Sequence, residues 1–216
     1  MKYTIFSDTH LSKYFDEKKY NFLKKIISNS ETIIINGDFW EAYNFKFDEF
    51  ILSSWKKLFK DLKNKKTIYL FGNHDKKIYA NNKLSEFSVR QFQNIKIISG
   101  SKTFYIEHGD KITPLWDKFF RRMPKFINIF LNNLEKMIVF LFGINVLKIL
   151  YKRFNEDMKN KKSRILKDNE YLVCGHTHFM EIDKKNHYIN GGFIKHGIGQ
   201  YLTITDGKVE LHNEKY

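Results

Sequence analysis

Five short polar blocks occur along the chain in a fixed order, and each of them follows a run of apolar or β-branched residues. The blocks are Asp8-Thr9-His10, Gly37-Asp38, Gly72-Asn73-His74-Asp75, His108-Gly109-Asp110 and Gly175-His176-Thr177-His178. Carboxylate and amide oxygens combined with imidazole nitrogens, without thiolates, suit divalent ions such as Mn²⁺, Fe²⁺ or Zn²⁺. A carboxylate such as that of Asp38 can donate one oxygen to each of two ions. The blocks therefore predict a two-metal centre.

Such a centre indicates a particular reaction. Two ions about 3.5–4 Å apart bind both the attacking and the leaving oxygen of an in-line displacement, and they lower the pKa of a bridging water so that hydroxide exists near neutral pH. Cleavage of a phosphoester or a pyrophosphate needs this arrangement. A single Asp-x-His or Gly-Asp pair also occurs by chance in surface turns, so the prediction depends on the joint occurrence of the blocks, each after a strand.

The elements that would position these blocks are short strands alternating with helices. Runs rich in β-branched or aromatic residues predict strands at Lys2–Phe6, Thr32–Ile35, Thr67–Phe71, Thr103–Glu107 and Tyr171–Cys174. Apolar residues at three- and four-residue spacing predict helices around residues 22–27 and 50–59. Alternation of the two indicates an α/β domain, in which ligands gather at the strand ends.

The end of the chain is predicted to be rich in strands. Candidate strands are Tyr188–Asn190, Gln200–Thr205 and Lys208–His212, and the turn signal Asp206-Gly207 joins the last two as a hairpin. We expect this hairpin to complete a sheet.

The ordered blocks resemble those of the calcineurin-like metallophosphoesterases, and the resemblance extends from Met1 to about Leu211. It implies a four-layer αββα sandwich with two mixed sheets packed face to face and helices outside. It also implies a first ion held by Asp8, His10 and His178, a second held by Asn73, His108 and His176, and Asp38 as the bridge. Mn²⁺ is the expected ion, with Fe²⁺ or Zn²⁺ as alternatives.

The resemblance gives the third block a separate role in catalysis. His74 would not bind metal but would contact the scissile phosphate and protonate the leaving oxygen, with Asp75 fixing its tautomer and orientation. A His beside a carboxylate can titrate near neutral pH and act as a general acid, so the assignment is chemically reasonable. His196, which follows Asn190-Gly191-Gly192, is expected at the surface or next to the site without binding metal.

Residues 112–166 exceed what a strand–helix connection needs, and they predict a helical cap inserted within a single domain of residues 1–216. Apolar residues at helical spacing predict two amphipathic helices separated near Gly143. The longest uncharged run, Met137–Leu147, is too short for the roughly 20 apolar residues that span a bilayer. Aromatic and basic residues mix before it, and Arg121, Arg122 and Lys125 are candidates for holding a diphosphate.

Within the superfamily, the chain most resembles the UDP-2,3-diacylglucosamine diphosphatase branch of lipid A synthesis. The resemblance lies in Ser7-Asp8-Thr9-His10-Leu11, in Gly37-Asp38-Phe39-Trp40-Glu41-Ala42 and in a helical cap after the His-Gly-Asp block. It implies attack by a metal-bridging hydroxide on a lipid-linked nucleotide diphosphate, giving UMP and a lipid phosphate. One position differs, because better-known members of this branch carry Arg where this chain has His74.

Composition leaves two further functions to weigh. The 216 residues carry a formal net charge of +14, which also suits a phosphodiesterase acting on nucleic acid or cyclic nucleotides. A non-catalytic binding scaffold is disfavoured, because every expected ligand position and His74 are filled. Met1 leads directly into the first strand, so we expect a cytoplasmic protein, with contact to an anionic inner membrane face through the cap as a further option.

Overall fold

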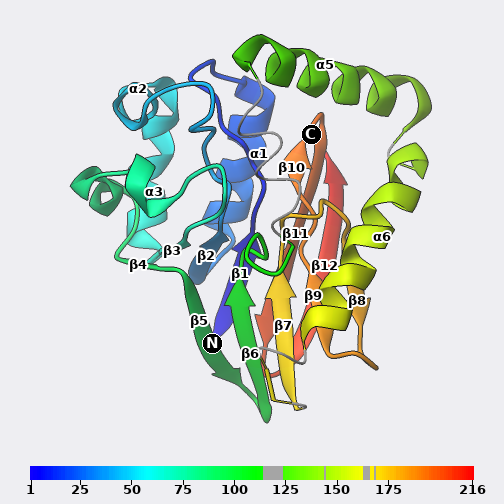
Figure 1. Cartoon of the computed structure of the whole chain (residues 1–216). Coiled ribbons are helices and arrows are strands. Elements are labelled where there is room, and N and C mark those ends of the chain that lie inside the picture. The colour runs from blue at the N-terminus through cyan, green and yellow to red at the C-terminus, as the bar shows by residue number, and fades with distance from the viewer. Residues whose placement is uncertain (114–123, 144, 163–165, 168) are drawn as a thin grey trace.

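The computed structural model describes residues 1–113, 124–143, 145–162, 166–167 and 169–216. Within these ranges the strands form two sheets (Figure 1). The first sheet has the order β10-β11-β1-β2-β3-β4, with β12 paired to β11. Its strands are β1 (Lys2–Phe6), β2 (Thr32–Asn36), β3 (Ile68–Leu70), β4 (Arg90–Phe92), β10 (Ile194–Lys195), β11 (Ile198–Thr205) and β12 (Lys208–Lys215).

The second sheet has the order β5-β6-β7-β9-β8. Its strands are β5 (Asn94–Ser99), β6 (Lys102–Glu107), β7 (Glu170–Cys174), β8 (Glu181–Asp183) and β9 (Tyr188–Asn190). The strands that precede the polar blocks run parallel to their neighbours: β1 pairs with β2, β2 with β3, and β6 with β7. Their carboxyl ends therefore lie at the same edge of each sheet.

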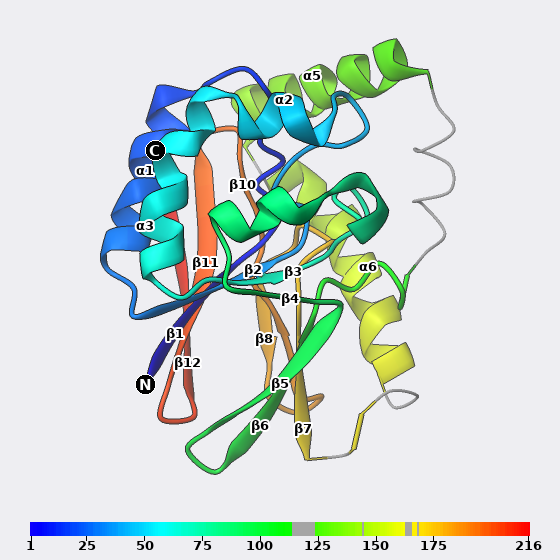
Figure 2. The same cartoon turned by 90° about the vertical axis from the view of Figure 1, so that its left-hand side faces the viewer.

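The helices cover the outer faces of the two sheets (Figure 2). The helices α1 (Glu17–Ser28), α2 (Phe47–Ile51) and α3 (Phe59–Asn64) lie on the side of the first sheet, and α6 (Asn145–Lys162) lies on the side of the second. The helix α5 (Lys125–Phe142) runs across the end of the sandwich at which the strands of the polar blocks finish (Figure 1).

Three apolar clusters hold these layers together. Phe22, Leu23 and Ile26 of α1 pack on the first sheet, where Ile33 and Ile35 point outward. Ile34 and Ile5 point to the other face and meet Phe104 and Val173 of the second sheet. Met158 of α6 packs against Leu172 and Tyr188. Alternation along β2 thus buries both faces of a central strand, and the predicted four-layer sandwich is confirmed.

Local sequence explains most element boundaries. Asp16 caps α1 by accepting the Lys19 backbone N–H at 3.0 Å. Asp206 and Gly207 both have positive φ, 48° and 77°, as the two-residue turn between β11 and β12 requires. The helix expected around residues 50–59 is divided into α2, a 3₁₀ turn at Ser54–Leu58 and α3. Strands β4, β5, β8 and β10 were not anticipated from pattern.

Two helices lie within residues 112–166, the segment that the sequence predicts to be a helical cap. Helices α5 and α6, called the cap helices below, are separated at Gly143, whose φ is 71°. None of the described helices is long and apolar enough to cross a bilayer. Arg121 and Arg122 lie outside the described residues, and Lys125 begins α5 without a described side chain.

Candidate metal centre

The first two polar blocks lie side by side because the loops after β1 and β2 continue the pairing of their strands. The Asp8 N–H donates to Gly37 O at 3.2 Å, and the His10 N–H donates to Asp38 O at 2.9 Å. A further bridge joins Leu11 and Trp40. These backbone hydrogen bonds thus place the side chains of Asp8 and His10 close to that of Asp38.

Several residues of these blocks adopt the left-handed backbone that side chains other than glycine rarely adopt. Positive φ occurs at Asp8 (53°), His10 (43°), Asp38 (53°), His176 (65°) and His178 (56°). Such conformations cost free energy, persist only where the surrounding structure enforces them, and cluster at functional sites. Here they turn five polar side chains out of the strand direction and toward one another.

All seven residues expected to bind metal come together at the strand ends. Asp8, His10 and His178 form one group with ligand atoms within 4.8 Å of one another, and Asp38, His108 and His176 form a second. Asn73 joins the second group through its Oδ1, which lies 3.0 Å from His108 Nε2. His10 also forms a third group with Glu41 and His74. The residues that the family resemblance assigns to the two ions thus lie close together, in the first two groups.

In both Asp8 and Asp38, one carboxylate oxygen accepts a backbone N–H and the other faces the histidines of the cluster. Asp8 Oδ2 accepts the His176 N–H at 3.0 Å, and Asp8 Oδ1 lies 3.2 Å from His178 Nε2. Asp38 Oδ1 accepts the His74 N–H at 2.8 Å. Asp38 Oδ2 lies 3.8 Å from His10 Nε2 and 3.2 Å from His108 Nε2, one imidazole from each group. Asp38 Oδ2 thus faces an imidazole of each group.

Two buried atoms identify this as a place for a cation. Asp8 Oδ1 and His10 Nε2 are buried, and neither makes a hydrogen bond of acceptable geometry with the described residues, although His178 Nε2 lies 3.2 Å from Asp8 Oδ1. A buried polar atom without a partner costs about 1–3 kcal/mol. A divalent ion would satisfy both atoms, and the mixed oxygen and imidazole donors fit such an ion. The residues present therefore fit the metal that the sequence predicts.

The imidazole of His108 is oriented by the backbone. Its Nδ1–H donates to Asn36 O at 2.8 Å, which directs Nε2 toward Asp38 and Asn73. A histidine ligand commonly donates its second ring N–H in this way, which fixes the ring and makes the ligating nitrogen more basic. The sequence contains no local signal for this contact, since Asn36 precedes the second block and His108 begins the fourth.

The pKa values of the histidines in the site depend on their burial and on the charged groups that face them. Burial, with His74 nearby, lowers the pKa of His10 to about 4, and burial, with His108 nearby, lowers the pKa of His176 to about 3. Both rings are thus neutral at pH 7, the form that binds metal. Burial also disfavours charge on His108, but Asp38 and Asp8 outweigh it and hold the pKa of His108 well above its usual value.

The carboxylate that contacts His74 is Glu41, and this corrects the expectation that Asp75 orients the ring. Glu41 Oε1 accepts from His74 Nδ1 at 2.8 Å, while Glu41 Oε2 lies 3.1 Å from His10 Nδ1. Burial disfavours charge on Glu41, but His74 and His10 outweigh it and keep its pKa well below its usual value. Glu41 therefore connects the candidate acid to a candidate metal ligand.

The carboxylate of Asp75 instead accepts hydrogen bonds from two loops and from a tyrosine. Its Oδ1 accepts the Gly72 N–H at 2.7 Å, and its Oδ2 accepts the Phe39 N–H at 2.7 Å and the Tyr69 hydroxyl. These bonds join the loops that carry Asp38 and Asn73. Asp75 thus supports the site by holding two of its loops together.

Two contacts of the site were missed in the sequence. Glu41 stands three positions after Asp38, and its acidic character near a metal-binding block was the available signal. The Tyr43 hydroxyl donates to Asn73 O at 3.0 Å, and its ring lies 4.2 Å from the His74 ring between centroids. His196 lies next to the site, as expected, with Nε2 3.6 Å from Glu135 of α5.

Glycines in the blocks allow the carboxylates to approach the backbone closely. A Cβ at Gly72 would overlap Asp38 Oδ1, and a Cβ at Gly175 would overlap Ser7 Oγ and Asp8 Oδ2. Any side chain at either position would displace an aspartate of the cluster. This explains in physical terms why both blocks begin with glycine.

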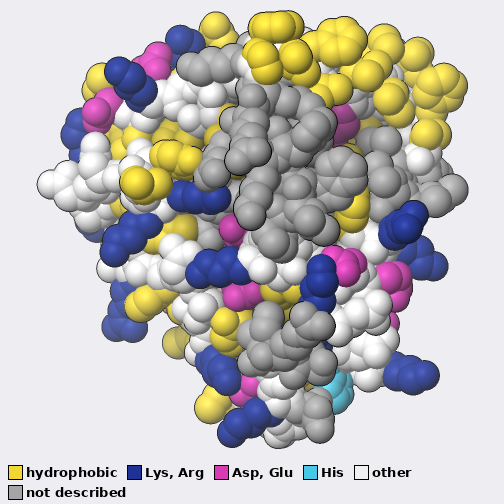
Figure 3. Space-filling model, viewed as in Figure 1, with side chains coloured by type: hydrophobic (Ala, Val, Ile, Leu, Met, Phe, Trp, Pro, Cys, Tyr) yellow, Lys and Arg dark blue, Asp and Glu magenta, His cyan; other side chains and the backbone are white. Residues whose placement is uncertain are grey.

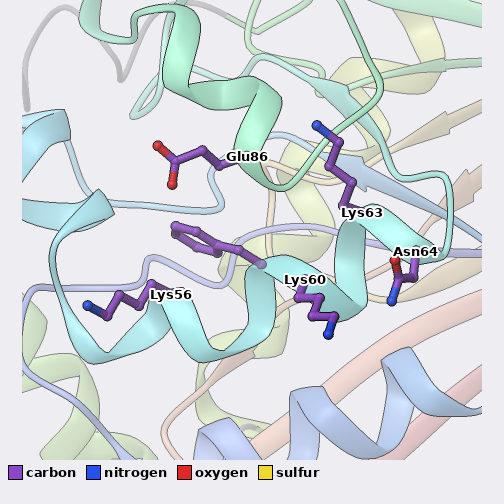
Figure 4. A pocket seen from close by; sticks show the side chains of 6 residues that line it. Lys56, Lys60, Lys63, Asn64 and Glu86 are labelled. Atoms are coloured by element: carbon purple, nitrogen blue, oxygen red, sulfur yellow. The ribbon is translucent and has the colours of Figure 1, made fainter.

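A surface hollow of about 530 Å³ lies on α3 and the preceding 3₁₀ turn (Figure 4). Its lining residues are Lys56, Phe59, Lys60, Lys63, Asn64 and Glu86, and none belongs to the metal cluster. The hollow is basic, but it is separate from the residues that could do chemistry.

Comparison with known proteins agrees with this geometry. The family model described as calcineurin-like phosphoesterase matches residues 1–180. No curated protein sequence matches the chain. Among solved structures, the phosphoesterase Yfce from E. coli is similar, with 16% identity, a TM-score of 0.52, and coverage of 95% of this chain and 89% of that one. This likeness shows a shared fold.

Two other solved structures are less similar. An archaeal phosphodiesterase has 20% identity and a TM-score of 0.48, with both chains covered in full. Vps29 from Entamoeba histolytica has 13% identity and a TM-score of 0.46, with 100% of this chain and 99% of that one covered. The family match spans most of the chain, from the first strand to the loop that carries His176 and His178. This chain therefore belongs to the calcineurin-like phosphoesterase family, and it is a metal-dependent phosphoester hydrolase.

Proposed function

We propose that the protein is a two-metal hydrolase that cleaves the pyrophosphate of a lipid-linked nucleotide, such as UDP-2,3-diacylglucosamine, to give UMP and a lipid phosphate. In this proposal Asp8, His10 and His178 hold one divalent ion, Asn73, His108 and His176 hold the other, and Asp38 bridges them. Mn²⁺ is the proposed ion. Divalent ions at these positions would neutralise charge on the phosphoryl group and make water acidic enough to supply hydroxide near neutral pH.

The residues of the chain supply orientation and a proton. His74 Nε2 lies 4.0 Å from Asp38 Oδ2, so the ring faces the cluster while its Nδ1 donates to Glu41. Ionised Glu41 stabilises the imidazolium form of His74, which can then protonate the leaving oxygen. The ring of Tyr43 beside His74 limits its movement.

The observation that supports a lipid-linked substrate is the exposed apolar surface of α5 (Figure 3), which continues to the start of α6. More than half of each of the following side chains is exposed: Phe126, Phe130, Met137, Leu141, Phe142 and Val146. Contiguous exposed apolar residues indicate a binding surface. Because Glu135 of the same helix reaches toward His178, a substrate could place its diphosphate at the cluster and its alkyl chains along α5. Arg121, Arg122 and Lys125 stay proposed as diphosphate contacts.

The test is UMP release from UDP-2,3-diacylglucosamine by Mn²⁺-loaded protein, with Asp38→Asn as the control. Release by the wild type and not by the variant is the expected result. If wild-type protein with bound metal hydrolyses bis(p-nitrophenyl) phosphate but releases no UMP, the lipid-linked substrate is wrong and the hydrolase remains.

A separate assay with nucleic acid tests the alternative substrate class. Hydrolysis of short DNA or RNA that falls steeply between 50 and 200 mM salt, as expected when lysines follow a phosphate backbone, would favour a nucleic-acid phosphodiesterase. The net charge of +14 is the observation behind this alternative.

A further inference from the structure

The histidine at the end of the fifth block is surrounded by the cap helices. Glu135 Oε1 of α5 lies 4.0 Å from His178 Nδ1, and the Tyr151 hydroxyl of α6 donates to the same oxygen at 2.9 Å. The Tyr151 ring also meets the His178 ring edge-on, with centroids 5.8 Å apart. Both cap helices thus contribute to the surroundings of one candidate ligand.

Glu135 is held in place by Lys195 of β10 and by His196 in the turn after that strand. Its Oε2 lies 3.1 Å from Lys195 Nζ and 3.6 Å from His196 Nε2, and only 21% of its side chain is exposed. The ion pair with Lys195 therefore fixes the Glu135 carboxylate beside the imidazole of His178.

A second contact joins α6 to the same loop. Asn155 is fully buried; its Nδ2 donates to Phe179 O at 2.9 Å, and its Oδ1 accepts the Thr177 hydroxyl. Tyr188 also donates to Asn155 Oδ1, at 2.8 Å. The residues on both sides of His178 are thus hydrogen-bonded to α6.

From these contacts we infer that Glu135 is a positioning residue for His178, through which the cap helices set the affinity of the first metal position. His178 Nε2 points to Asp8 Oδ1 at 3.2 Å, while Nδ1 faces Glu135. At 4.0 Å the interaction with Glu135 is electrostatic and not a hydrogen bond. A carboxylate on the far side of a histidine ligand fixes the ring and increases its basicity.

The Nδ1 atoms of His10, His108 and His178 face different groups. His10 contacts Glu41, His108 donates to Asn36 O, and His178 faces Glu135. The first two supports come from the end of β2 and the loop after it, whereas the third comes from α5. The cap would then do more than receive substrate, because removing its carboxylate should weaken one metal position and spare the other.

This inference rests on the proposed metal binding and is tested by measuring that binding directly. Mn²⁺ is titrated calorimetrically into metal-free wild type, Glu135→Ala, Glu135→Gln and the control Glu156→Gln, and bound Mn²⁺ per chain is measured after gel filtration. Glu156 lies on α6, half exposed, and pairs with Lys159 at 3.0 Å. Parallel titrations with Co²⁺ report the coordination of each position through the visible absorption spectrum.

In Glu135→Ala we expect one of two equivalents to bind about 10- to 100-fold more weakly, as for other partners of histidine ligands, with the second equivalent unchanged. Glu135→Gln should weaken the same equivalent, because the amide lacks the charge on which the interaction with His178 depends at 4.0 Å. Glu156→Gln should match the wild type. Tyr151→Phe, which keeps Glu135 but removes a donor to it, is the milder variant if Glu135→Ala does not fold.

The outcomes separate this inference from the proposed function. If folded Glu135→Ala binds both equivalents like the wild type, or loses both equally, the positioning role is refuted while the metal centre remains. If the wild type itself binds no divalent ion, the proposed two-metal function is wrong and this inference is overturned with it.

Discussion

Replacing Glu41 by Gln tests the structure against the sequence most directly, because the sequence favoured Asp75 as the partner of His74. Glu41 contacts His74 Nδ1 at 2.8 Å and His10 Nδ1 at 3.1 Å, and only 13% of its side chain is exposed. Gln keeps the length of the side chain and one acceptor oxygen but removes the charge and one of the two contacts.

The size of the effect follows from the contact that is lost. A hydrogen bond to a charged group contributes about 1.5–3 kcal/mol, which corresponds to about a 10- to 150-fold change in a rate constant. Part of the effect should appear as weaker metal binding, because Glu41 also orients His10. We therefore expect Glu41→Gln to lower kcat on bis(p-nitrophenyl) phosphate by about 10- to 100-fold and to reduce bound Mn²⁺.

The assay compares three variants for kcat, bound Mn²⁺ and melting temperature. His74→Ala should keep its metal and lose turnover. Asp75→Asn should lower the melting temperature first, since its amide would face the backbone N–H of Gly72 or Phe39, at a cost of about 1–3 kcal/mol for each donor left without an acceptor. The reasoning is refuted if Glu41→Gln keeps normal kcat and metal while Asp75→Asn loses turnover at normal stability.

Two further predictions concern the cluster. Gly72→Ala should lose metal and activity, because its Cβ would overlap Asp38 Oδ1. The control Gly191→Ala should keep both, because its Cβ would meet only Leu202, at 3.5 Å. Equal metal content in the two variants would contradict the argument that the Asp38 carboxylate needs a glycine at position 72. Metal binding should release about one proton near pH 7, since Asp38 and Asp8 raise the pKa of His108 and keep its ring protonated until an ion replaces the proton. Affinity should then fall as pH falls, by up to about tenfold per pH unit. Calorimetry in buffers of different ionisation enthalpy counts the protons, and no release at pH 7 would contradict this protonation. In the metal-free protein the stability that comes from the raised pKa of His108 is fully present below the unfolded value of 6.5 and is lost as pH rises through the folded value.

Local sequence determined the strands that carry the site and the chemical types of its ligands. The strands Lys2–Phe6 and Tyr188–Asn190 have the predicted boundaries, because runs of β-branched and aromatic residues that end in small polar residues are local signals. The positions of Asp8, Asp38 and His108 at parallel strand ends follow from the same pattern. Asn94–Ser99 escaped prediction as a strand, since its polar residues and partly exposed edge position provide a weaker pattern.

Only the tertiary structure decided which carboxylate supports which imidazole. Asp75 is adjacent to His74 in sequence, yet its oxygens bind the loop backbones, while Glu41 reaches His74 across 33 positions. Glu135 is 43 positions from His178, and nothing in either local pattern relates them. Sequence periodicity reports the face of an element that is buried, but contacts between side chains of different elements depend on loop backbone conformation and layer packing. The left-handed backbone at Asp8 and His178 and the placement of the cap helices arise at that level.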